Sequence, residues 1–152
     1  MTSSDWARNG WLLPHRTSPQ EIGDLLAIVE RDLSDSQASG LSADWRLNIA
    51  HNAALQAATA ALAASGYRAS RDQHHYRVIQ SHELTIGADR DVVNRLDAFR
   101  KKRNVGGYER AGGTSEGEAG EMRDLAQSIA QNVRAWLSRT RPDLLGSRGK
   151  SN

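Results

Sequence analysis

The basic segment of residues 99–110 has the clearest capacity for chemistry in this sequence. Residues 100–110 carry five basic side chains and one acidic side chain, a local net charge of +4. Arginine can grip a phosphate with two parallel hydrogen bonds, and the glycines at 106 and 107 permit close approach of the backbone to a ligand. Tyr108 can stack on a base. The segment favours an anionic ligand such as RNA, although a solvated helix end that offsets the helix dipole has the same composition.

A second group of chemically capable residues is the histidine cluster at positions 74–82. His75 and His82 are seven residues apart, which predicts one shared face on a helix, and Glu83 follows directly. The cluster lacks the pair of ligands four residues apart that is typical of helical metal sites. We therefore expect no metal here.

The composition sets limits on both sites. A chain of 152 residues has the length of a single domain. Its net charge of +2 is too small to imply nucleic-acid binding by bulk electrostatics. The absence of cysteine excludes disulfides, thiolate zinc sites and a cysteine nucleophile. No apolar run reaches the roughly 18 residues of a membrane span, and no secretory signal begins the sequence. We expect a cytoplasmic protein that has no membrane association.

The elements that must position these residues are expected to be helices. The three prolines lie at 14, 19 and 142, so the interior lacks the strongest helix breaker, and strand signals are poor. The apolar spacing and the capping residues predict five helices: about 18–36, 42–66, 74–86, 89–106 and 115–141. Residues 67–73 are expected to be a connection.

Three further expectations concern packing. Nine alanines between residues 50 and 64 predict a central helix to which its neighbours come close. Trp45 is expected to anchor the start of that helix against the core, and Trp136 to lie within the core. Part of the segment before residue 18 is expected to pack, because it holds Trp6 and Trp11.

Several short motifs occur one after another along the chain. They are Leu41-Ser42-Ala43-Asp44-Trp45-Arg46, Ser65-Gly66-Tyr67-Arg68, His74-His75-Tyr76 and Arg103-Asn104-x-x-x-Tyr108. Over about residues 18–138 this set resembles the higher eukaryotes and prokaryotes nucleotide-binding (HEPN) family. That resemblance implies a helical bundle, usually a homodimer, in which the arginine motifs of two subunits face a shared cleft.

The resemblance also implies a function. Active HEPN proteins are metal-independent ribonucleases of toxin–antitoxin or defence systems, often paired with a small nucleotidyltransferase. By this resemblance Arg103 would hold the scissile phosphate and Asn104 would orient it. The family's acid–base histidine is replaced by Tyr108, which at neutral pH is a poor general base because the ordinary pKa of tyrosine is near 10. His74 or His75 could supply the missing group.

We therefore expect an all-α, HEPN-like bundle of about five helices over 18–141, with an N-terminal arm at 1–17 and a flexible tail at 142–152. The expected function is RNA or nucleotide binding, with altered or impaired ribonuclease activity and no cofactor. The alternative is a non-catalytic interaction protein that binds a nucleotidyltransferase or is modified by it at Tyr108. The remaining candidate phosphate-binding residues are Arg100, Lys101, Lys102 and Arg110.

Overall fold

The computed structural model describes residues 2–106 and 113–145, with the backbone alone for residues 103–106. The described residues form six α-helices, a two-stranded sheet and one 3-10 turn. The helices are α1 (Ser3–Arg8), α2 (Pro19–Asp35), α3 (Ala43–Ala64), α4 (His74–Ile86), α5 (Arg90–Gly106) and α6 (Glu116–Thr140), and the turn is Pro142–Leu144. The all-α helical bundle is confirmed, and α2 to α6 are the five helices expected from the sequence.

The helix starts follow from their capping residues. Ser18, Ser42 and Ser115 each accept a hydrogen bond from the backbone N–H three residues later, at the starts of α2, α3 and α6. At α6 the Glu118 carboxylate in turn accepts a hydrogen bond from the backbone N–H of Ser115, which completes a capping box. Serine at these positions satisfies N–H groups that have no partner within the helix.

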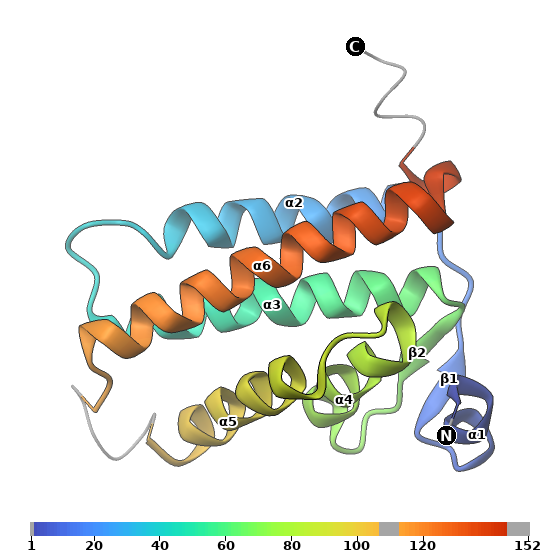
Figure 1. The fold of residues 1–152 in the computed structure, drawn as a ribbon, viewed down its shortest axis with the longest axis horizontal. Helices are drawn as coiled ribbons and strands as arrows, with labels where there is room; N and C mark the ends of the chain where they lie inside the picture. The colour runs from blue at the N-terminus through green and yellow to red at the C-terminus, as the bar shows by residue number, and fades with distance from the viewer. Residues whose placement is uncertain (1, 107–112, 146–152) are drawn as a thin grey trace.

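Helix α3 lies at the centre of the bundle. It packs against α2, α6, α4 and α5, and Figure 1 shows α2, α3 and α6 running lengthwise together with α4 and α5 along one side. Thirteen of its 22 residues are buried, nine of them alanines. Small side chains let several neighbouring helices approach one axis, as the alanine content predicted.

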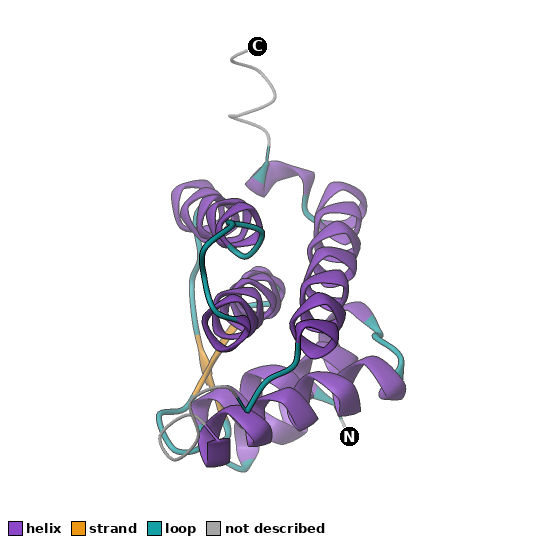
Figure 2. Cartoon of the chain, turned by 90° about the vertical axis from the view of Figure 1, so that its left-hand side faces the viewer, coloured by secondary structure: helices purple, strands orange, loops and turns teal. Residues whose placement is uncertain are grey.

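The residues before α2 fold onto the bundle rather than extending from it. Strand β1 (Leu12–Pro14) pairs antiparallel with β2 (Tyr67–Ala69), with Leu12 opposite Ala69. Figure 2 shows the two short strands in orange, crossing each other in this view beside the helices. The expectation that 67–73 is only a connection is wrong for its first three residues, because the facing Leu12 and Ala69 are both buried and the pairing covers them. As expected, Trp6 packs in the core.

Two expectations about tryptophans need correction. Trp45 is 62% exposed, so it does not anchor the start of α3 against the core. Trp136 packs against the core but is only partly buried. None of the helices in the described ranges has the length and apolar character needed to cross a bilayer.

Candidate functional site

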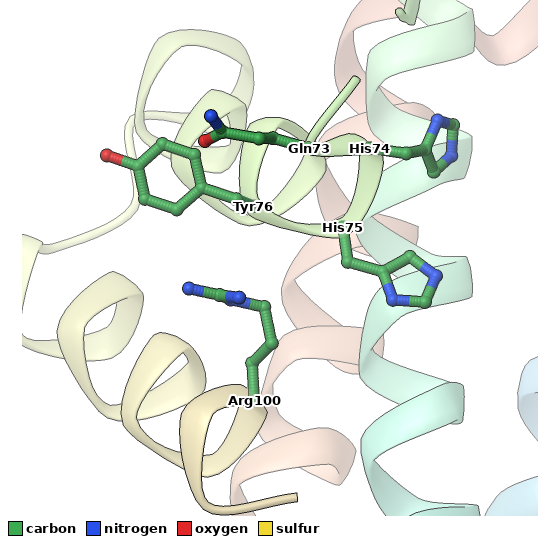
Figure 3. Close-up of a pocket in the computed structure, with 5 residues that line it drawn as sticks. All are labelled: Gln73, His74, His75, Tyr76 and Arg100. Carbon is green, nitrogen blue, oxygen red and sulfur yellow. The ribbon is translucent and has the colours of Figure 1, made fainter. Parts of the chain in front are cut away.

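A surface pocket lies between the first turn of α4 and the second half of α5. Its volume is about 420 Å³. Its lining, shown in Figure 3, consists of Gln73, His74, His75, Tyr76 and Arg100. The pocket brings together three residues that the sequence had singled out separately, since His74 and His75 come from one predicted site and Arg100 from the other.

The guanidinium of Arg100 is held on two sides. Its Nε donates a 2.6 Å hydrogen bond to Oδ1 of Asp97, one turn earlier on α5, and its Cζ lies 5.4 Å from the centre of the Tyr76 ring. In Figure 3 the guanidinium lies under Tyr76 at the pocket. A planar guanidinium that is fixed along its Nε edge presents its Nη atoms to a ligand in a set orientation.

The beginning of α4 adds positive partial charge to the pocket. Gln73, the N-cap residue, has a left-handed backbone (φ 53°, ψ 41°) and makes no capping hydrogen bond with its side chain. The N–H groups of the first helical turn have no intrahelical partner, and the helix dipole places positive partial charge at this end. Because residues 73–76 line the pocket, the pocket is electropositive from both helices.

The two pocket histidines are exposed and close to each other. Their ring centres are 5.9 Å apart, and Nδ1 of His74 lies 3.2 Å from the carbonyl oxygen of Ser70. Histidine can take and give protons near neutral pH, and in Figure 3 both imidazoles extend to the side of the pocket away from the Arg100 guanidinium.

His82 is separate from this pair. His75 and His82 lie seven residues apart on α4, but the core covers this helix only from Val78 onward, so His82 is 1% exposed while His75 is exposed. Burial lowers the pKa of His82 to about 4, and its Nδ1 has no hydrogen-bond partner. His82 is therefore a neutral core residue. Across residues 2–106 and 113–145, no three histidines or carboxylates are grouped as a metal ion would need.

The other cations of the basic segment have different surroundings. Nζ of Lys101 lies 3.6 Å from Oδ2 of Asp97, so this carboxylate serves two cations. Lys102 forms an ion pair with Glu118 and links α5 to the start of α6, and the pKa of Glu118 is lowered first by this hydrogen bond. Lys102 thus serves a helix–helix contact rather than the pocket.

The residues that carried the sequence motif are placed only in part. Arg103 and Asn104 belong to α5, one turn beyond Arg100, and their side chains lie outside the described residues. Tyr108 and Arg110 lie outside the described residues altogether.

Three residues of the site were missed by sequence reasoning. Tyr76 was named only within the His74-His75-Tyr76 motif and given no role, and Gln73 and Asp97 were not considered. Asp97 had a usable signal, because an acid three residues before an arginine is a helical ion-pair spacing. Gln73 and Tyr76 had none, since their roles depend on how α4 lies against α5.

Comparisons of the chain with protein-family models, curated proteins and solved structures found no match.

Proposed function

We propose that this protein is an HEPN-like module that binds RNA or a nucleotide through a phosphate held by Arg100. The observation that carries the proposal is the fixed guanidinium of Arg100, bonded to Asp97 and stacked on Tyr76 in a pocket with two histidines. An arginine fixed before binding loses little side-chain entropy when it meets an anion. Its fork of N–H groups matches phosphate oxygens.

The size and charge of the pocket suit this ligand. Its volume of about 420 Å³ lies in the range of ordinary ligand sites and exceeds the space of one phosphate group. The positive end of α4 and the nearby Lys101 favour a polyanion. The same chemistry would be offered by an RNA chain and by a free nucleotide, so the test includes both.

The histidine pair favours a cleaving form of the module. His74 or His75 would take the proton of a ribose 2′-hydroxyl, whose oxygen then attacks the adjacent phosphorus. The bond to the 5′-oxygen breaks, and that oxygen leaves with a proton from a second acid. The products are a 2′,3′-cyclic phosphate and a 5′-hydroxyl. Arg100 would neutralise the charge that develops on the phosphoryl oxygens.

The binding test is a fluorescence anisotropy titration of a short labelled single-stranded RNA. Arg100→Gln should weaken binding about tenfold and reduce the slope of log K against log salt by about one, because one phosphate contact is lost. Arg95→Gln removes the same charge from an exposed position on α5 and should bind like the wild type. Unlabelled RNA, DNA of the same sequence and ATP are compared as competitors. Equal affinities of wild type and Arg100→Gln would refute the proposal.

The cleavage test uses the same RNA with a chelator present. Loss of the 2′,3′-cyclic product in His75→Ala or His74→Ala, with RNA affinity retained, would support the cleaving form. If the wild type binds RNA without cleaving it, the cleaving form is refuted and the protein is a module that only binds RNA.

One observation favours the alternative of a protein-interaction module. Leu41 and Trp45, at the start of α3, are the large apolar side chains of the described residues that stay exposed. A purely protein-directed module would show no RNA binding even at low salt. Light scattering of the 16.7 kDa chain tests the homodimer that the family resemblance implies, which would have twice this mass.

A further inference from the structure

Arg77 lies among aromatic rings, one position after the pocket residue Tyr76. Its Cζ is 4.1 Å from the centre of the Trp11 ring, 5.4 Å from that of Tyr76 and 5.8 Å from that of Trp6. No ion pair is formed by Arg77 with any carboxylate of the described ranges. Stacking on aromatic faces is therefore the main contact of this cation.

The tryptophan rings around Arg77 are fixed in position. Trp6 and Trp11 meet edge to face, with ring centres 5.5 Å apart. The backbone N–H of Trp11 donates a 3.0 Å hydrogen bond to the backbone carbonyl of Trp6. The carbonyl of Trp11 accepts a 3.0 Å bond from the N–H of Ser70, just before α4. The β1–β2 pairing continues this attachment. The N-terminal segment thus offers Arg77 a rigid surface.

Tyr76 has a guanidinium near its ring from each of two helices. Arg77 and Arg100 both have their Cζ atoms 5.4 Å from the ring centre. The contacts therefore run without a break from Trp11 through Arg77 and Tyr76 to Arg100. Arg77 itself does not line the pocket.

We propose that Arg77 is a positioning residue for the ligand-binding arginine, and that the N-terminal segment sets the affinity of a pocket it does not line. Stacking of Arg77 on Trp11 holds the Tyr76 ring, and the ring holds the guanidinium of Arg100 in its binding orientation. The inference rests on the proposed function, which makes Arg100 the residue that binds phosphate.

The test is a double-mutant cycle on RNA affinity at constant salt. Arg77→Lys keeps the charge and removes the planar group that stacks, so long-range attraction of RNA is unchanged. We expect a loss of about three- to tenfold in Arg77→Lys and about tenfold in Arg100→Lys. The double variant should bind no more weakly than Arg100→Lys alone. Losses that multiply would show that Arg77 acts independently of Arg100 and would overturn the inference.

Two controls separate positioning from general damage. Arg68→Lys, an exposed position on β2, should bind RNA like the wild type, and circular dichroism should show equal helix content in all variants. Trp11→Leu removes the other side of the same stack and should reproduce the loss in Arg77→Lys, so the inference stays testable if one variant does not fold. Normal binding in both Arg77→Lys and Trp11→Leu would refute it.

A measurement on the free protein distinguishes failure of this inference from failure of the proposed function. In a ¹H–¹⁵N spectrum, the Nε–Hε signal of Arg100 should shift in Arg77→Lys, because the ring current of Tyr76 moves with the ring. This result needs no RNA. If the signal shifts in a protein that does not bind RNA, Arg77 positions Arg100 but phosphate binding by Arg100 is refuted. If the signal does not shift, the positioning role of Arg77 is refuted.

Discussion

Asp97 and Arg100 form a 2.6 Å hydrogen bond between a carboxylate and a guanidinium one turn apart on α5, with side chains only 10% and 19% exposed. Charges this far from water depend on their partners, because desolvation is offset only by the pairing. The pair therefore has two consequences. It orients Arg100 toward the pocket, and it makes the second half of α5 sensitive to the charge at position 97.

Asp97→Asn should lower the free energy of unfolding by about 1–2 kcal/mol, because a charge-assisted bond becomes a neutral one. Urea denaturation at neutral pH measures the loss. Asp124→Asn, an exposed position on α6, is the matched control and should change stability by less than about 0.5 kcal/mol. Equal denaturation midpoints for Asp97→Asn and wild type would show that this pair has no net effect.

His82 should make stability depend on pH below neutrality. Burial lowers the pKa of this histidine from 6.5 to about 4. Between these values the unfolded chain binds a proton that the folded chain does not, so the free energy of unfolding falls as the pH falls. The slope is about 1.4 kcal/mol per pH unit, and the total loss is about 3 kcal/mol by pH 4.

The measurement is thermal or urea unfolding from pH 7 to pH 4, with His82→Leu as the comparison. Leucine cannot titrate and removes the buried Nδ1 that lacks a partner, so this variant should lose less stability on acidification than the wild type. Parallel pH profiles for the two proteins would contradict a neutral buried His82.

Overpacking of α3 should be costly on its buried faces. Ala57 is fully buried, and a leucine there would force the neighbouring helices apart, with an expected loss of about 1–3 kcal/mol. Gln56→Leu places the same side chain on the half-buried side of this helix and should cost less. Urea midpoints compare the two. A tolerated Ala57→Leu would mean that alanine is not required for close helix packing.

The expected helices and most of the apolar core were readable from the sequence because they depend on local signals. Ser18, Ser42 and Ser115 cap helices where their spacing to the following residues predicted. The apolar residues of α6 are spaced three or four apart, and those on one side of the helix, among them Met122 and Ile129, are buried. In α5, Leu96 and Phe99 are buried, and Val93 is buried more completely than its neighbour Val92.

The non-local parts of the fold and site were not readable. The β1–β2 pairing joins residues more than 50 positions apart. Each strand is only three residues long, which is too short for an alternating hydrophobic pattern to predict it. The Tyr76–Arg100 contact depends on how α4 lies against α5. Sequence reasoning found the charged and titratable members of the pocket, Arg100 and the two histidines, and missed the aromatic and acidic side chains that orient them.

A polar contact between α2 and α3 provides a further test of packing. Asp32 is 5% exposed, and its Oδ2 accepts a 2.7 Å bond from Nδ2 of Asn52. Asn52→Ala should cost about 1–3 kcal/mol of unfolding free energy, because a buried carboxylate oxygen loses its donor. Asn48→Ala, one turn earlier on α3, should cost less. Equal losses in urea unfolding would assign the effect to the helix rather than to the bond.

The most direct test of phosphate binding at Arg100 follows its Nε–Hε signal while a short single-stranded RNA is added to the ¹⁵N-labelled protein. Assignment comes from the absence of that signal in Arg100→Lys. We expect the signal to move saturably, with the affinity found by anisotropy, while the signal of Arg95 on the same helix stays in place. An unmoved Arg100 signal at saturating RNA would contradict the account.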